Sequence, residues 1–200
     1  MRNETSIMKI RIPKSEIRNG NADPVRVWII GYGNPHRRDD GVGPHVVNGL
    51  GRFLGPRRGC RLLSLLQLNP DLAEDMRDAH SIVLVDASAE YIEGGWSWTR
   101  VLPEWGDLPY LTHHTSPPFF LGLLQAVYHA CPAMWLVSVQ GEDFGFGEGL
   151  CPETEKRAKA VIWDIARWMS QEKLTRRNQI ENDIQRGISN GSWRRHTRGG

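Results

Sequence analysis

Two carboxylates and one imidazole stand out in this sequence because each lies in a polar string beside an apolar run. Asp40 ends the string GYGNPHRRDD, Asp86 ends the run IVLVD, and His114 lies in THHTSP. Together they could supply three ligands to a divalent metal and leave positions open for water or substrate. Imidazole suits nickel, zinc, copper and iron, whereas carboxylates alone favour magnesium or manganese. The set therefore predicts a borderline transition metal that activates water, acts as a Lewis acid or is carried by a partner.

Four further polar residues accompany this set. Asn34 and Asp39 lie in the first of these strings, Gln67 lies at the end of the next apolar run, and His113 stands beside the imidazole. Adjacent side chains diverge, so only one histidine is expected to join the cluster; His114 is favoured and His113 is the alternative. Asp39 is as well suited to capping a turn as to chemistry, because a short carboxylate can bond free N–H groups.

An open parallel sheet would bring these residues to one edge, because ligands in such sheets bind beyond the carboxyl ends of the strands. Short apolar runs predict the strands, and apolar residues at helical spacing predict the helices between them. This alternation indicates an α/β fold with parallel pairing and helices on both faces. The expected strands are 25–33, 60–68, 81–88, 133–141 and an antiparallel edge strand at 96–102, and the expected helices are 42–54, 69–78, 116–130 and 151–171.

The length of 200 residues suffices for one domain with a sizeable core. We expect the folded domain to span 24–171, with a mobile extension at 1–23 and a basic, disordered tail at 172–200. The net charge is +2, yet residues 172–200 alone carry seven Lys/Arg against three Asp/Glu. Such a charged run is usually solvated, so no nucleic-acid partner is expected.

Several protein classes are excluded by what the sequence lacks. No apolar run approaches the roughly 20 residues that span a bilayer, and no signal-peptide pattern is present, so a cytoplasmic protein with no membrane partner is expected. His36 interrupts the glycine fingerprint of dinucleotide-binding proteins, and the P-loop, HExxH and GxSxG motifs are absent. Cys60, Cys131 and Cys151 are odd in number and widely spaced, which argues against a disulfide framework or a cysteine zinc site.

Five loop strings follow one another along the chain: GYGNPHRRDDGVG, LNPDLAEDM, LVDAS, THHTSP and VQGEDFGFGEGLCP. In order and spacing they resemble the hydrogenase maturation proteases, the endopeptidases that process the large subunit of nickel–iron (NiFe) hydrogenases. The resemblance covers residues 25–169. It implies a three-layer α/β/α sandwich around a mostly parallel, twisted five-stranded sheet.

The same resemblance implies an activity, a metal and a partner. Members of the family remove a short C-terminal peptide from the large-subunit precursor after nickel insertion, and they recognise nickel that the precursor's cysteines hold. The positions that match the family's catalytic and metal-contacting residues are Asp40, Asp86 and His114. Nickel is therefore expected to arrive with the precursor rather than to reside in this protein, which is expected to be a monomer.

Two other functions fit the same residues: a self-contained metallohydrolase, and a chaperone that binds a metalloprotein precursor without cutting it. No nucleophile for the peptidase is evident, because the three cysteines match no catalytic position of the family and Ser116 lies in no nucleophile elbow. A metal-polarised carbonyl would serve, as would a water directed by Asp39 or Asp40. The sequence leaves this step open.

Overall fold

The structure is a computed structural model that describes residues 26–55, 59–104 and 115–189, with side chains described as far as residue 172. Within these residues a five-stranded sheet has the order β2-β1-β3-β5-β4. Strand β4 is antiparallel to β5, and the other neighbouring pairs are parallel. All the predicted strands, including the antiparallel edge strand, are confirmed. Their bounds are β1 (Val27–Tyr32), β2 (Cys60–Leu65), β3 (Ser81–Ser88), β4 (Trp96–Arg100) and β5 (Ala133–Gln140).

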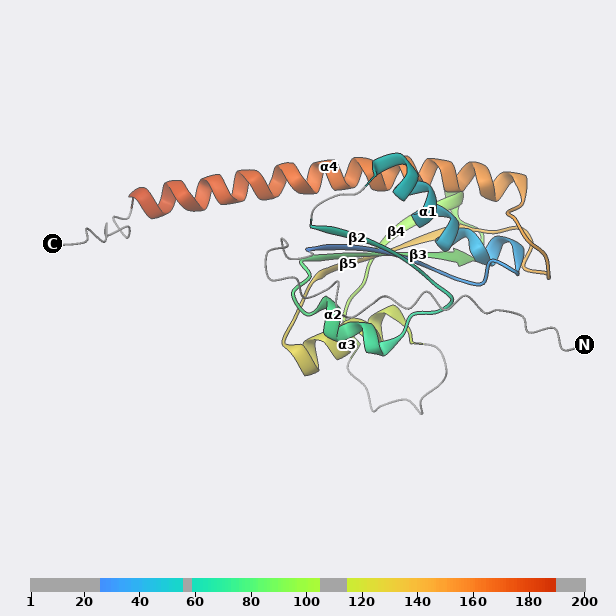
Figure 1. The fold of residues 1–200 in the computed structure, drawn as a ribbon, viewed down its shortest axis with the longest axis horizontal. Coiled ribbons are helices and arrows are strands. Elements are labelled where there is room, and N and C mark those ends of the chain that lie inside the picture. Colours follow the sequence, from blue (N-terminus) through green and yellow to red (C-terminus); the bar gives the residue numbers. More distant parts are fainter. Residues whose placement is uncertain (1–25, 56–58, 105–114, 190–200) are drawn as a thin grey trace, which may run out of the picture.

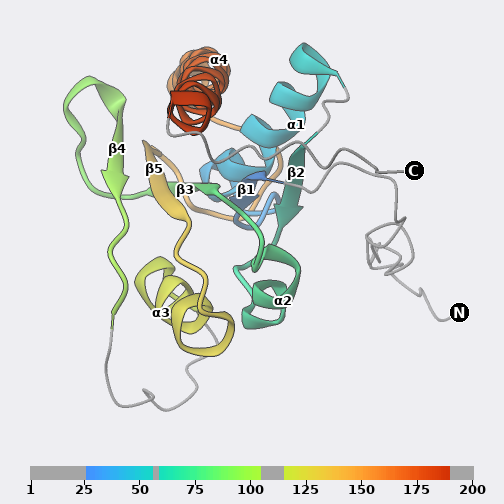
Figure 2. The same cartoon turned by 90° about the vertical axis from the view of Figure 1, so that its left-hand side faces the viewer.

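Helices cover both faces of this sheet (Figure 1; Figure 2). Helices α1 (Val42–Leu54) and α4 (Pro152–Ser189) lie on one face, and α2 (Ala73–Met76) and α3 (Pro117–Tyr128) lie on the other. The predicted three-layer α/β/α sandwich is therefore confirmed. Short 3₁₀ turns lie in three of the connections: η2 (Arg38–Gly41), η3 (Pro70–Leu72) and η4 (Glu93–Gly95).

The sheet separates two apolar cores. Ile29 and Val83 are fully buried in the core that includes α1 and α4, while Ile30 and Leu84 are fully buried in the core that includes α2 and α3. Burying such a side chain contributes about 1.5 to 3 kcal/mol. Because β1 and β3 are covered on both faces, each contains an unbroken apolar run instead of an alternating pattern.

Two caps on the second face form as the sequence predicts. Ser116 precedes α3, and its Oγ accepts a hydrogen bond from Phe119 N at 3.3 Å. Asn69 precedes η3, and its Oδ1 accepts a hydrogen bond from Asp71 N at 2.9 Å. Each cap satisfies an N–H group that has no partner within its helix. The caps thereby fix where the chain leaves the sheet edge and begins each helix.

Helix α4 is longer than the sequence predicted. The expected end at Gln171 is wrong, because the helix continues to Ser189 and projects beyond the sheet (Figure 1). Residues 172–189 contain no proline and are rich in Glu, Lys, Arg and Gln, so they extend a helix that is already nucleated and packed. The expected extension at 1–23 lies outside the described residues, as does 190–200. Despite this length, none of the described helices is apolar enough to cross a bilayer.

Helix α1 begins in close contact with the carboxyl ends of two strands. A Cβ at Gly43 would lie 2.5 Å from both Tyr32 O and Val85 O, so only glycine allows this approach. The contact sets the start of α1 against β1 and β3. It thereby brings the loop that precedes α1 beside the end of β3.

Candidate active site

A cleft of about 590 Å³ opens at the carboxyl ends of β1, β2 and β3. Four of the predicted site residues line it, namely Asn34, Asp40, Gln67 and Asp86. The segment 115–117, at the start of α3, forms part of the same wall. Residues far apart in the sequence therefore meet at the edge where a parallel α/β sheet binds its ligands.

Asp40 is held at the cleft by the loop that follows β1. Its Oδ2 accepts a hydrogen bond from Asn34 N at 2.9 Å, and its N donates to Arg37 O at 3.0 Å. Gly33 has a φ of +135°, and a Cβ at this position would lie 1.9 Å from Asp40 O. This glycine therefore allows the loop to fold back over the end of the strand, which is a role unrelated to a dinucleotide phosphate.

Asp86 ends the buried part of β3 and carries the most perturbed carboxyl group of the cleft. Its Oδ1 accepts a hydrogen bond from Ala87 N at 2.8 Å, and the hydroxyl of Tyr32 donates a second one. Burial raises the pKa of Asp86 to about 6, the two hydrogen bonds oppose the rise, and the negative charge of Asp40 adds to it. The group therefore changes protonation close to neutral pH, within the range in which acid–base catalysts work.

Tyr32 is a site residue that the sequence did not point to. Burial raises the pKa of Tyr32 well above its usual value, and the charge of Asp86 and the hydrogen bond between the two groups raise it further. The phenol thus stays protonated and acts as a donor. Its position offered a signal, because the last side chain of β1 reaches the same sheet edge as the residues after it.

Asp39 does not line the cleft and has a structural role. The residue is fully buried, and its Oδ2 accepts hydrogen bonds from Glu142 N, Asp143 N and Thr154 Oγ1 at 2.7, 3.0 and 2.8 Å. Its Oδ1 accepts from Cys151 N at 2.7 Å. Burial alone would raise the pKa of Asp39, but these donors lower it overall. Of the two roles open to Asp39 from the sequence, the turn-forming one is realised, and its oxygens are not available to direct a water.

The predicted histidines His113 and His114 lie outside the described residues. Thr115 and Ser116, which follow them directly, line the cleft. Among the described residues no group of three His, Cys, Asp or Glu side chains is arranged to hold a metal. The described part of the cleft thus offers the two carboxylates Asp40 and Asp86, and the imidazole ligand stays a prediction.

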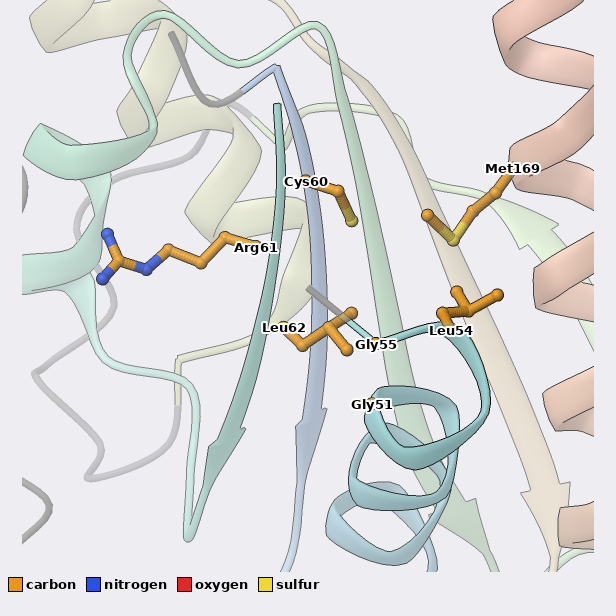
Figure 3. Close-up of a pocket in the computed structure, with 7 residues that line it drawn as sticks. All are labelled: Gly51, Leu54, Gly55, Cys60, Arg61, Leu62 and Met169. Carbon is orange, nitrogen blue, oxygen red and sulfur yellow. The ribbon is translucent and has the colours of Figure 1, made fainter. Parts of the chain in front are cut away.

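A second cavity, of about 330 Å³, lies at the opposite end of the sheet between β2 and the end of α1 (Figure 3). Leu54, Leu62 and Met169 contribute apolar side chains to it, and the side chain of Arg61 points away from them (Figure 3). Among the residues that the structure describes, no carboxylate, imidazole or hydroxyl lines this cavity. It therefore lacks the acid–base groups that make the first cleft the candidate active site.

The fold is similar to that of solved maturation proteases. HycI, a NiFe hydrogenase maturation protease from Thermococcus kodakarensis, superposes with a TM-score of 0.57 at 21% identity, over 72% of this chain and 91% of that one. The maturating endopeptidase HybD from Escherichia coli gives a TM-score of 0.55 at 21% identity, over 74% and 93% of the two chains. The hydrogenase 2 maturation peptidase from Thaumarchaeota archaeon SCGC_AB-539-E09 gives a TM-score of 0.54 at 19% identity, over 72% of this chain and 98% of that one.

At these identities the similarity establishes a common fold. No protein-family profile and no curated protein matches the chain. The architecture expected from the loop strings is therefore confirmed by structure, while the chemistry must be argued from the residues of the cleft.

Proposed function

We propose that this protein is an endopeptidase that removes a short C-terminal peptide from the large-subunit precursor of a NiFe hydrogenase after nickel insertion. The observation that carries the proposal is the meeting of Asp40 and Asp86 in one open cleft. The fold shared with solved maturation proteases supports it. So does the 115–117 segment, which directly follows His114 in the sequence and forms part of the wall of this cleft.

The nickel in this proposal belongs to the substrate. Two carboxylates from the described residues, joined by the imidazole of His114, are modest donors for a nickel ion that already carries the precursor's thiolates. Such a set contacts the loaded precursor and gains little from an empty one. Nickel loading thereby becomes the condition for processing.

The described part of the cleft fits hydrolysis by water better than attack by a cysteine or by Ser116. None of the three cysteines lines the cleft, and the Oγ of Ser116 is engaged in capping α3. In the proposed step water adds to the carbonyl carbon, the C–N bond breaks and the leaving amine takes a proton. Asp86, whose pKa is about 6 in the protein without nickel, is suited to accept the proton from water and return it to the amine through the carboxylate oxygen that does not contact nickel. Tyr32 holds the carboxyl group in place for this transfer.

The test compares nickel-loaded and nickel-free precursor, with the product identified by mass spectrometry. We expect loss of a C-terminal peptide from the loaded precursor alone, and no processing by Asp40→Asn or Asp86→Asn. Asp75→Asn, an exposed residue of α2 outside the cleft, is the matched control and keeps the wild-type rate. A stable complex without cleavage would instead favour the chaperone, and hydrolysis of small amides by a metal-retaining preparation would favour the metallohydrolase.

A further inference from the structure

Arg37 brings a positive charge to the mouth of a cleft that otherwise carries two carboxylates. Its side chain is exposed and lines the cleft together with Asp40 and Asp86. No other Lys or Arg side chain lines the cleft within the described part of the chain. The cleft is therefore bipolar, with negative charge at its floor and a cation at its rim.

Hydrogen bonds restrain both the guanidinium of Arg37 and the backbone that carries it. Its Nε and Nη2 donate hydrogen bonds to Phe144 O at 3.2 and 3.1 Å. The backbone of Arg37 forms a parallel bridge with Gly147, and its N donates to Asn34 O at 2.9 Å. A guanidinium restrained in this way loses less conformational entropy on binding a ligand than a free side chain does.

The charge of Arg37 is not neutralised by the described residues. Its neighbour Arg38 pairs with Asp143 at 3.2 Å, whereas Arg37 has no such ion pair within the described part of the chain. The two bonds to Phe144 O use two of the five N–H groups of the guanidinium, so three remain for a ligand. A guanidinium group binds a carboxylate through two parallel hydrogen bonds. A carboxylate is therefore a better acceptor for it than a single carbonyl oxygen is.

We infer that Arg37 binds a carboxylate of the C-terminal extension that the proposed peptidase removes, and so selects among precursors. The inference rests on the proposed function. The extension ends in a free carboxylate, which has the chemistry that a guanidinium binds. An acidic side chain of the extension offers the same chemistry. Either one would meet Arg37 at the rim while the nickel meets Asp40 and Asp86 at the floor.

The experiment uses the full chain and three nickel-loaded precursors: one with the native extension, one with the acidic side chains of the extension changed to amides, and one with an amidated C-terminus. We expect Arg37→Gln to raise KM for the native precursor about tenfold, with kcat within twofold, because a charge-assisted pair is lost. Arg37→Lys recovers part of the affinity. Arg77→Gln, an exposed arginine outside the cleft, is the matched control and leaves both constants unchanged.

The altered precursors identify the carboxylate and separate recognition from structure. The wild-type chain shows the raised KM with whichever precursor lacks the carboxylate that Arg37 binds, and Arg37→Gln then adds no further loss. An equal loss with all three precursors would overturn the inference, since it would indicate a purely structural bond to the loop of Phe144. Binding titrations with the same precursors report on Arg37 even if no cleavage occurs, so failure of the peptidase proposal is a separate result.

Discussion

The hydroxyl of Tyr32, the last residue of β1, donates a hydrogen bond to the carboxylate of Asp86 on the neighbouring strand β3. Both groups are largely buried. The charge of Asp86 and the hydrogen bond raise the pKa of Tyr32, whereas the same hydrogen bond lowers the pKa of Asp86 and partly offsets the rise that burial causes. The phenol remains a donor while the carboxyl group titrates at a pKa of about 6. This pair thus gives the candidate site a titratable acid in the neutral range without a histidine.

Tyr32→Phe removes the donor and should raise the pKa of Asp86 above about 6, because the hydrogen bond stabilises the ionised form. If ionised Asp86 is the form that acts on precursor, the acidic limb of the kcat/KM profile moves to higher pH, while the rate at alkaline pH changes little. The measurement is precursor cleavage between pH 5 and 8. Tyr91→Phe, at an exposed tyrosine, should leave the profile unchanged. An unshifted limb in Tyr32→Phe would show that another group controls the rate.

Asp86 also makes stability depend on pH. Its folded pKa of about 6 exceeds the unfolded value of 3.8, so its contribution is fully present below pH 3.8 and is lost as the pH rises through 6. Asp86→Asn, which cannot ionise, should therefore be more stable than wild type above pH 6 by about 1 to 3 kcal/mol, although the proposed function predicts that it does not process precursor. Urea unfolding at pH 4 and pH 7 measures this. A stability difference that is the same at both pH values would contradict the assigned pKa.

Most of the fold could be predicted because apolar periodicity determines it locally. The runs that became β1 and β3 are buried on both faces, and the capping residues Ser116 and Asn69 mark helix starts that depend only on nearby residues. The end of α4 could not be predicted. Beyond Gln171 the residues have only modest helix propensity, and the helix continues there because its preceding turns are already formed and packed.

The site was predictable where position along a strand was enough. Asp40 lies in the loop after β1 and Asp86 lies near the carboxyl end of β3, so their meeting at one edge was expected from topology alone. The role of Asp39 could not be decided, since its four donors come from residues 103 to 115 positions later in the chain. The role of Tyr32 could not be predicted either, because it arises from burial and from a partner on another strand.

Asp39→Asn tests the structural role of the buried carboxylate. An amide places N–H groups against N–H donors, so part of the four-bond network is lost, and we expect a loss of about 2 to 4 kcal/mol in unfolding free energy. The folded pKa of Asp39 is lowered, so its contribution is present above the unfolded value of 3.8 and is lost as the pH falls through the folded pKa. The stability deficit of the variant should therefore shrink in strong acid. Asp71→Asn, at an exposed position on η3, should cost far less.

Gly43→Ala tests whether the close approach of α1 positions the site. The added methyl group would lie 2.5 Å from two strand carbonyl oxygens, so the start of α1 must move away from β1 and β3. Overpacking of this kind costs about 1 to 3 kcal/mol, and the shift should separate Asp40 from Asp86 and lower processing at least tenfold. Gly51→Ala on the same helix meets only Leu62 Cδ1, at 3.4 Å, and should be neutral or slightly stabilising because alanine favours helix. Thermal unfolding and precursor cleavage of both variants measure the difference, and wild-type cleavage by a folded Gly43→Ala protein would show that this contact does not set the geometry of the cleft.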